Sequence, residues 1–132
     1  MEFDQVLALR KSVRSYTDEP VSKEDLAALV KAALASSVGK HNDAGYTLCV
    51  VTDPALLSAI DKEAEEKLSK PHMFFEAPAL IFICETKEAF DYLKEFDAGI
   101  IAEHIHRKPP TSVSALSSST ASSVIWGTTR TM

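Results

Sequence analysis

Four stretches of the chain carry apolar residues at the spacing of an amphipathic helix, with positions i, i+3 and i+4 on one face. They span residues 2–9, 22–34, 53–68 and about 87–106. Ser22 and Asp53 stand where helix N-caps are favoured, and Pro54 takes the first helical position. The pattern therefore predicts four helices, the last of which Gly99 can break.

Two further stretches lack that period and are rich in β-branched and aromatic residues. Residues 46–52 read YTLCVVT and residues 78–86 read PALIFICET, which predicts two strands, the second buried on both faces. Two strands form only a marginal sheet, and the apolar stripes of the helices exceed what two strands can cover. We therefore expect an α+β fold that needs more chain or a second copy of this chain.

Length and charge narrow the class of protein. The chain has 132 residues, which suits one domain, and a net charge of -5. That charge argues against nucleic-acid binding, because phosphate contacts need clustered Lys and Arg. No apolar run approaches the roughly 20 residues of a membrane helix. The acidic N-terminus, where a signal peptide would be basic, predicts a cytoplasmic protein. Cys49 and Cys84 lie in strand-like runs, which predicts buried, reduced thiols.

The composition changes abruptly at Arg107. All 19 acidic residues precede it, and 12 of the 22 residues from Thr111 to Met132 are Ser or Thr. Pro109 and Pro110 are expected to stop the incoming helix. The sequence therefore predicts a domain over residues 1–106 and a tail over residues 107–132 that is disordered or poorly folded.

The first candidate site is the basic segment Arg10-Lys11-Ser12-Val13-Arg14. In an extended segment Arg10, Ser12 and Arg14 point the same way. Two guanidiniums beside a hydroxyl can form a phosphate cradle, because Arg offers forked donors and Ser one more. The alternative is an ordinary solvated basic loop.

The second candidate is the segment from Ser36 to Gly45, which joins a predicted helix to a predicted strand. Gly39 and Gly45 allow unusual backbone angles and close approach of a ligand. Asn42 can donate and accept hydrogen bonds at once, as recognition of a heterocycle edge requires. The alternative is a plain helix-to-strand connection.

Histidine offers no metal site in this sequence. His104 and His106 are two residues apart on a predicted helix, so their side chains do not share a face. Helical zinc sites use a spacing of four instead. We expect no bound metal, and the sequence assigns no catalytic residue.

Several motifs together resemble the nitroreductase family. The opening Arg10 to Tyr16, followed by Glu19 to Ser22 and a capped helix, is similar to the start of that family. The strand ending at Val50 to Asp53 and the Ala-Pro strand entry within Phe75 to Ile81 also match. Asp97 to His104 resembles the start of the family's central helix. The resemblance covers about residues 3–106.

This resemblance implies an α+β sandwich of a central β-sheet with helices, built as an intertwined homodimer with FMN at the subunit interface. Hydride from NADH or NADPH would pass through the flavin to a nitro compound or another small acceptor. By motif position, Arg10 and Ser12 would hold the FMN phosphate, Arg14 the ring or ribityl end, and Asn42 the flavin. The sequence departs from the family around Asn42, because the family's preceding Pro-Ser and following Gln-Pro-Trp are absent.

A larger departure follows Arg107. Nitroreductases continue the central helix through small residues into a Gly-Leu-Gly-Ser turn, then further strands and a basic segment that touches the flavin phosphate. None of this appears in the tail. The domain is therefore expected to be incomplete. It is either an FMN oxidoreductase or a non-catalytic truncated remnant, an interaction module that retains the scaffold without a competent flavin site.

A one-base shift in reading frame would restore the missing turn. If Arg107 to Pro110 were encoded CGG-AAG-CCG-CCx, reading from the last base of the first codon would give Glu-Ala-Ala. The offset codons through Leu116 then permit Gly-Leu-Gly followed by Ser or Thr. Two hypotheses stay open: the tail is an out-of-frame product, or it is a genuine divergent tail.

The nucleotide sequence of the gene distinguishes these hypotheses. If the tail is out of frame, the offset frame should run on past His106 through Gly-Leu-Gly-Ser into further strand-like sequence. A stop within a few codons of that frame would mean that the tail is the protein's own.

Overall fold

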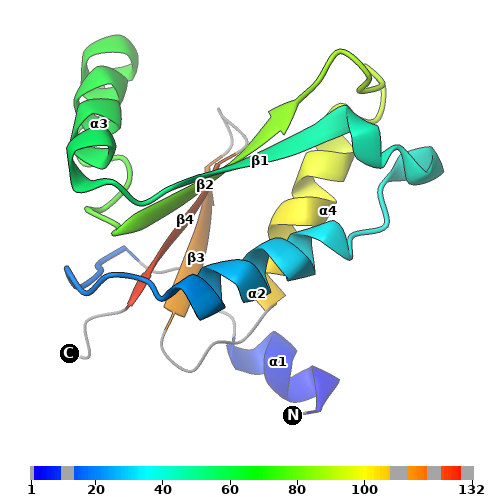
Figure 1. Ribbon diagram of the computed structural model, residues 1–132, viewed down its shortest axis with the longest axis horizontal. Helices are drawn as coiled ribbons and strands as arrows, with labels where there is room; N and C mark the ends of the chain where they lie inside the picture. Colours follow the sequence, from blue (N-terminus) through cyan, green and yellow to red (C-terminus); the bar gives the residue numbers. More distant parts are fainter. Residues whose placement is uncertain (1, 10–13, 108–112, 119–122, 129–132) are drawn as a thin grey trace.

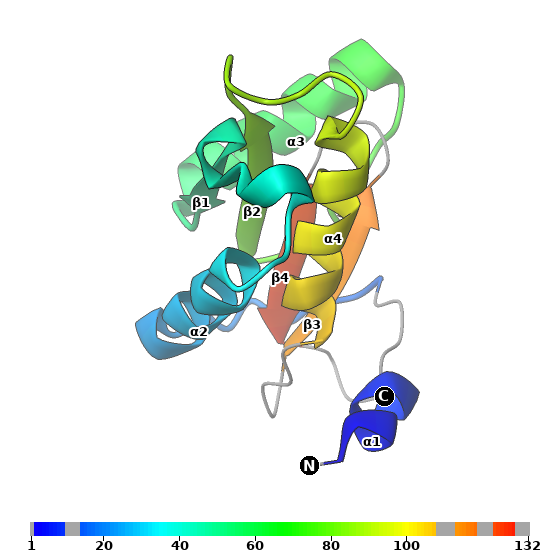
Figure 2. The ribbon, with the colours of Figure 1, turned by 90° about the vertical axis from the view of Figure 1, so that its right-hand side faces the viewer.

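The computed structural model describes residues 2–9, 14–107, 113–118 and 123–128, the last two ranges by their backbone. Its helices are α1 (Phe3–Leu9), α2 (Lys23–Leu34), α3 (Pro54–Leu68) and α4 (Lys94–Arg107), with two short 3-10 turns, η1 (Gly39–His41) and η2 (Asp43–Gly45). The strands are β1 (Tyr46–Val51), β2 (Ala79–Glu85), β3 (Val113–Ser118) and β4 (Ser123–Thr128). Figures 1 and 2 show how these elements are arranged.

Three helices form where the sequence predicted them, and two begin at the expected caps. The Ser22 hydroxyl accepts a hydrogen bond from the Asp25 N–H at 3.1 Å, and the Asp53 carboxylate accepts one from the Ala55 N–H at 3.1 Å. Each cap satisfies an N–H that the first turn of a helix leaves without an intrahelical partner. The α2 and α3 helices therefore begin where local chemistry directs them.

The fourth helix was predicted too long at its start. Residues 87–93 form successive turns, and α4 begins only at Lys94. Two of these turns close through hydrogen bonds from the Ala89 N–H to the Thr86 carbonyl and from the Leu93 N–H to the Phe90 carbonyl, both 3.0 Å. The helix then runs through Gly99 without a break, because buried residues on the following turn hold it against the sheet.

All four strands belong to one sheet in the order β1-β2-β4-β3, and every neighbouring pair is antiparallel. One face packs on α2 and α4 through the cluster Leu29, Ala33, Val38, Ala79, Ile81, Ile83, Ile101, Ala102 and Ile105. The other face packs on α3 and the loop after it through Tyr16, Val51, Phe74, Ala77 and Leu80. The α+β class and the double burial of β2 along most of its length are confirmed.

The prediction of a tail without regular structure is wrong for two of its segments. Residues 113–118 and 123–128 form β3 and β4, and β4 pairs with β2 from Ala79↔Trp126 to Phe82↔Ser123. The prediction weighed only the small apolar area of Ser and Thr. It left out the second edge of β2, whose unpaired backbone groups favour an added strand. The division of the chain at residues 106 and 107, and the frame of the tail, remain predictions.

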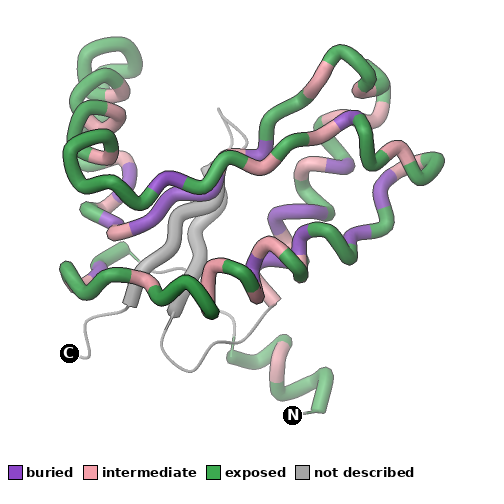
Figure 3. The backbone as a smooth tube through the Cα atoms, in the orientation of Figure 1, coloured by how far each residue is buried: buried purple, intermediate pink, exposed green. Residues whose placement is uncertain are grey.

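The cysteines were predicted to be buried, and they are exposed. Cys49 and Cys84 both reach solvent, because α3 covers only part of its face of the sheet. In Figure 3, the tube is purple along the first part of β2 and green at its end, and most of β1 is pink or green. Across the described residues, no helix is both long and apolar enough to cross a bilayer.

Candidate functional site

The predicted phosphate cradle can be followed at only one of its three residues. Arg10 and Ser12 lie outside the described residues, whereas Arg14 lies between α1 and α2 and is exposed. Two residues later, Tyr16 is buried in the cluster that contains Phe74. Burial raises the pKa of the Tyr16 hydroxyl, which therefore stays protonated. Tyr16 thus fixes the backbone from which Arg14 projects.

Residues 39–45, within the second predicted segment from Ser36 to Gly45, are joined to the turn after β2 by three hydrogen bonds. The Asn42 Nδ2 donates to the Glu88 carbonyl at 2.8 Å. The Thr86 hydroxyl donates to the Ala44 carbonyl at 2.7 Å, and the Thr86 N–H to the Gly45 carbonyl at 2.8 Å. One donor of Asn42 is therefore used within the chain, while its side-chain carbonyl retains the acceptor chemistry of an amide.

Gly39 and Gly45 serve packing rather than unusual backbone angles, which corrects the prediction for them. Neither has a positive φ; Lys40 and His41 have φ values of 55° and 53° instead. A Cβ on Gly39 would lie 2.6 Å from Leu93 Cδ1, and one on Gly45 would lie 2.9 Å from Asn42 Nδ2. The close approach that these glycines permit is to protein atoms of the neighbouring turn.

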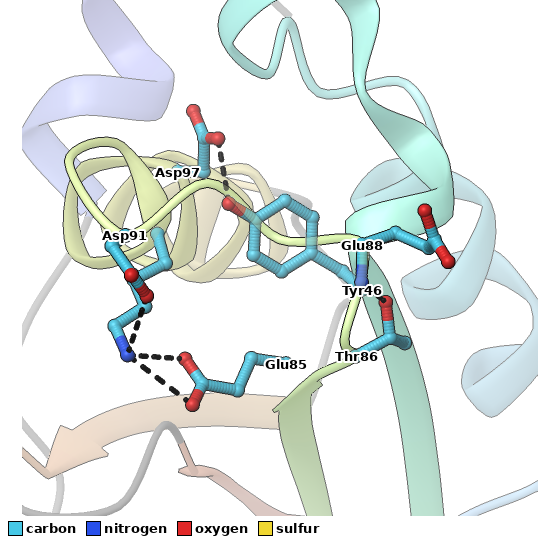
Figure 4. Close-up of polar contacts among 7 residues, drawn as sticks. Tyr46, Glu85, Thr86, Glu88, Asp91 and Asp97 are labelled. Carbon is cyan, nitrogen blue, oxygen red and sulfur yellow. Dashed lines mark hydrogen bonds and ion pairs between the residues drawn. The ribbon is translucent and has the colours of Figure 1, made fainter.

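Asp97, on the first turn of α4, is the residue that organises this segment, and the sequence did not identify it as a site residue. Its carboxylate is buried and accepts hydrogen bonds from the Gly39 N–H at 2.8 Å and from the Tyr46 hydroxyl at 2.6 Å. These two donors stand at the two ends of the 39–45 segment. Figure 4 shows the Tyr46 hydroxyl directed at Asp97.

The chemistry of this contact keeps the phenol protonated. Burial, and then the hydrogen bond and negative charge of Asp97, raise the pKa of Tyr46 above its ordinary value. The Tyr46 hydroxyl therefore stays protonated at neutral pH and donates its hydrogen bond to Asp97. A buried carboxylate is tolerated because hydrogen bonds offset the loss of hydration.

A signal for Asp97 was present in the sequence. Leu93, Ile101 and Ile105 are apolar residues of the predicted fourth helix, and Asp97 falls between Leu93 and Ile101 at the same spacing of four. An acidic residue on an apolar stripe must find partners when the helix packs. The identity of those partners, 51 and 58 residues away, required the tertiary structure.

A lysine lies beside two aromatic rings on the outer side of the same segment. The Lys40 Nζ lies 5.6 Å from the centroids of both the Phe90 and Tyr92 rings, which are 5.8 Å apart and tilted by 31°. A hydrogen bond to Tyr92 raises the pKa of Lys40. A cation within about 6 Å of a ring is attracted by its π electrons, so this contact supports the left-handed backbone at Lys40.

An unpaired polar atom lies at the start of the same connection. The Ser36 hydroxyl oxygen is buried, and it has no hydrogen-bond partner among the described residues. A buried donor of this kind costs free energy unless a ligand or water satisfies it. Ser36 and Asn42 are therefore polar groups near α2 that a bound ligand could engage after a small rearrangement.

Arg14 and Asn42, the two predicted site residues that the structure describes, are not brought together within one chain. Arg14 lies before the start of α2, and Asn42 lies beyond its end. The α2 helix has 12 residues, about 18 Å at the usual rise. Figures 1 and 2 both show the segment before α2 (blue) and the segment after it (cyan) well apart.

The two histidines on α4 have separate neighbours. His104 Nδ1 lies 3.0 Å from the Ile100 carbonyl oxygen, and His106 Nδ1 lies 3.3 Å from Glu103 Oε2. Within the part of the chain that is described, no group of three or more His, Cys, Asp or Glu side chains could hold a metal ion.

Comparison with protein families identifies the relatives of this chain. The family model of the nitroreductases matches residues 7–106, which is most of the chain. The chain belongs to the nitroreductase family. The match includes both predicted parts of the site in this nitroreductase, the arginine segment and the loop that carries Asn42. A comparison with curated proteins finds no match to it.

Solved structures share its fold at low sequence identity. A nitroreductase from Bacteroides fragilis with bound FMN has a TM-score of 0.81 at 13% identity, covering 98% of this chain and 89% of that one. A nitroreductase from Desulfitobacterium hafniense, also with bound FMN, has a TM-score of 0.79 at 18% identity, covering 97% and 89%. These similarities confirm the nitroreductase-like α+β sandwich.

A third relative is longer than this nitroreductase. An FMN-dependent nitroreductase from Clostridium difficile has a TM-score of 0.72 at 23% identity. The match covers 87% of this chain but only 60% of the Clostridium difficile chain.

Removing the Asp97 carboxylate should loosen the 39–45 segment. We expect Asp97→Ala to lower the free energy of unfolding by about 3 kcal/mol, because two donors lose a charged, buried acceptor. Tyr46→Phe removes only one of these bonds and should cost about 1–2 kcal/mol. Urea denaturation measures both.

The matched control is Asp91→Ala. Asp91 carries the same charge near the start of α4, but its side chain is 99% exposed and lies 3.7 Å from Lys94 Nζ. We expect a change below about 0.5 kcal/mol there. Equal losses in Asp97→Ala and Asp91→Ala would contradict the role assigned to Asp97.

Proposed function

We propose that this nitroreductase is an FMN-dependent oxidoreductase. It passes hydride from NADH or NADPH through the flavin to a nitro compound or another small electron acceptor. The observation that carries the proposal is the family match over residues 7–106, on a fold that two FMN-bound nitroreductases share. A cytoplasmic location, predicted from the acidic N-terminus, is part of the same proposal.

The residues present fit the flavin in part. Arg14 is exposed on an anchored backbone, so its forked N–H donors can reach a phosphate or a polar ring edge. By motif position, Arg10 and Ser12 complete this end of the site. The buried Ser36 hydroxyl is a polar group that a bound ligand would satisfy. When bound, FMN would supply the ring that accepts and donates hydride.

Asn42 would take a narrower role than the family motif implies. One of the two N–H donors of its Nδ2 already donates to the Glu88 carbonyl, so contact with a flavin would use its other N–H or its side-chain carbonyl, or follow a local rearrangement. Asp97 acts indirectly, because it holds both ends of the segment that carries Asn42. We therefore class Asp97 as a positioning residue.

We further propose that the functional unit is a homodimer. Arg14 and Asn42 lie at opposite ends of α2, so a second copy could supply the part of a site that one copy keeps at a distance. Apolar side chains on the outer surface of α4 and at the end of α2 support this. Phe96 is 73% exposed, Leu34 is 73% exposed, and Ile100 follows Phe96 one turn later and is also exposed.

The alternative is a non-catalytic remnant that keeps the scaffold without a competent flavin site. One observation favours it: Asn42, which the family motif assigns to the flavin, already uses one of its two amide N–H donors for the Glu88 carbonyl in this chain. The two proposals differ in one property that is simple to measure, which is the binding of FMN.

The phosphate cradle makes a quantitative prediction. Arg10→Ala should weaken FMN binding by about 2 kcal/mol, roughly 30-fold in Kd, because a charge-assisted contact is lost. Arg14→Ala should act in the same direction. Titration of apoprotein with FMN, followed by visible absorption, measures the affinity.

Lys23→Ala is the control for this titration, since Lys23 is exposed at the start of α2 and its loss removes the same charge. We expect its affinity to equal that of the parent. Equal affinity in Arg10→Ala would remove the cradle from the site. Absence of FMN binding in the parent protein would favour the remnant.

Association makes a second prediction. The parent should sediment as a dimer or a larger species, because burial of apolar surface favours contact between two copies. Phe96→Glu should shift the protein toward monomer, since it places a charge on the exposed surface of α4. Leu56→Glu, on the exposed surface of α3, should leave the sedimentation unchanged. A parent that is a monomer with a cooperative melt would contradict the dimer.

A further inference from the structure

The two cysteines lie on the same face of the sheet, on neighbouring strands. In the register of β1 and β2, Cys49 is opposite Phe82, and Cys84 is opposite Thr47. Residues directly opposite share a face, and so do residues two apart in one strand. Cys49 and Cys84 are therefore diagonal neighbours on one face.

That face is covered at one end and open at the other. Val51 and Leu80, an opposed pair near α3, are buried in the second core cluster. Phe82, two residues along β2, is partly buried, and Cys84, two further, is exposed. Cys49 on β1 is exposed as well. Figure 1 shows α3 beyond the end of β1 at Val51, far from the end of β1 at Tyr46. Both thiols thus reach solvent on the uncovered end.

Among the described residues, the register between β2 and β4 runs as far as Phe82↔Ser123. Cys84 lies two residues further along β2 than this last described pair. Cys49 lies opposite Phe82, which pairs with β4 and packs at the margin of the second core cluster, whereas Cys84 lies two residues beyond Phe82.

Their separation disfavours a direct disulfide. Diagonal neighbours in an antiparallel pair have Cα atoms about 7–8 Å apart, whereas a disulfide usually spans about 4.4–6.8 Å. A bridging ion lengthens the connection, because it replaces one S–S bond of about 2.0 Å by two metal–sulfur bonds of about 2.3 Å each. The spacing of Cys49 and Cys84 suits a bridged pair better than a bonded one.

Two thiolates select a particular class of ion. Zinc usually takes four protein ligands in a structural site, and the described part of the chain holds no group of three or more candidate ligands. Soft thiolate ligands favour Cu(I) among the transition-metal ions, and Cu(I) accepts two sulfur ligands in a linear arrangement. We propose that Cys49 and Cys84 form a two-thiolate site for a soft monovalent cation of the Cu(I) class.

Charge and protons are both accounted for when Cu(I) binds. Each thiol releases one proton to solvent as its sulfur coordinates, so one Cu(I) displaces two protons and keeps its oxidation state. This inference is independent of FMN, because neither cysteine belongs to the predicted flavin site.

The test is a titration of the reduced, full chain with Cu(I) under anaerobic conditions, in competition with a chromophoric Cu(I) chelator. We expect one equivalent to bind per chain. Cys49→Ser and Cys84→Ser should each weaken binding by on the order of 100-fold or more, because either change leaves a single soft ligand. Met73→Leu is the control, since it removes a soft sulfur from the neighbouring cluster and should change nothing.

A second measurement uses the parent protein alone. N-ethylmaleimide should alkylate both cysteines in the metal-free chain and neither in the Cu(I)-loaded chain, as read by mass spectrometry. Retention of the full affinity in either serine variant, protection of only one thiol, or no binding of Cu(I) would overturn the site. Ready formation of a Cys49–Cys84 disulfide in air would also overturn it, because the thiols would then be too close for the proposed bridge.

Discussion

The structure depends first on the burial of β2. This strand pairs with β1 on one edge and with β4 on the other, and its residues alternate between the two core clusters. Leu80 faces the α3 side and Ile81 faces α2 and α4, both almost wholly removed from solvent. Burial of each such side chain contributes about 1.5–3 kcal/mol. Without β2 the two layers of helices would share no common support.

A second, polar constraint lies in the core between the sheet and the helices α2 and α4. Asp97 enters the core on the stripe of α4 that otherwise carries Ile101 and Ile105. Its two hydrogen bonds fix the end of η2 and the start of η1 against that helix. The Nζ of Lys94, one turn earlier, lies 3.1 Å from the Oε2 of Glu85 at the end of β2 (Figure 4). The start of α4 is thus tied both to the loop and to the sheet.

These ties affect the proposed function. The segment that carries Asn42 is held by Asp97, by Thr86 and by the contact of Gly39 with Leu93, so it is defined before any ligand binds. The backbone next to Arg14 is fixed separately, through Tyr16 on the opposite side of the sheet. A site that uses both segments must therefore be assembled between chains or by a change in one of them.

The local helices and strands could be predicted from sequence patterns alone. The caps at Ser22 and Asp53, the stripe of α2 and the two β-rich runs lie in residues close along the chain, and they predicted α2, α3, β1 and β2 correctly. The motifs from Arg10 to Ser22, Phe75 to Ile81 and Asp97 to His104 also carried the family resemblance that the comparison confirmed. Short-range patterns suffice for this, because caps and periodicity act over a few residues.

The contacts between distant segments became known only from the folded chain. It showed that the glycines near Asn42 serve packing, that Asp97 lies between Gly39 and Tyr46, that the fourth helix starts late, and that tail segments pair with the free edge of β2. The exposure of both cysteines also required the tertiary structure, because it depends on how far α3 extends over its face of the sheet. These outcomes depend on contacts between residues that are far apart in sequence. The burial and hydrogen bonds that stabilise such contacts exist only once the chain has folded, so a local sequence pattern does not encode them.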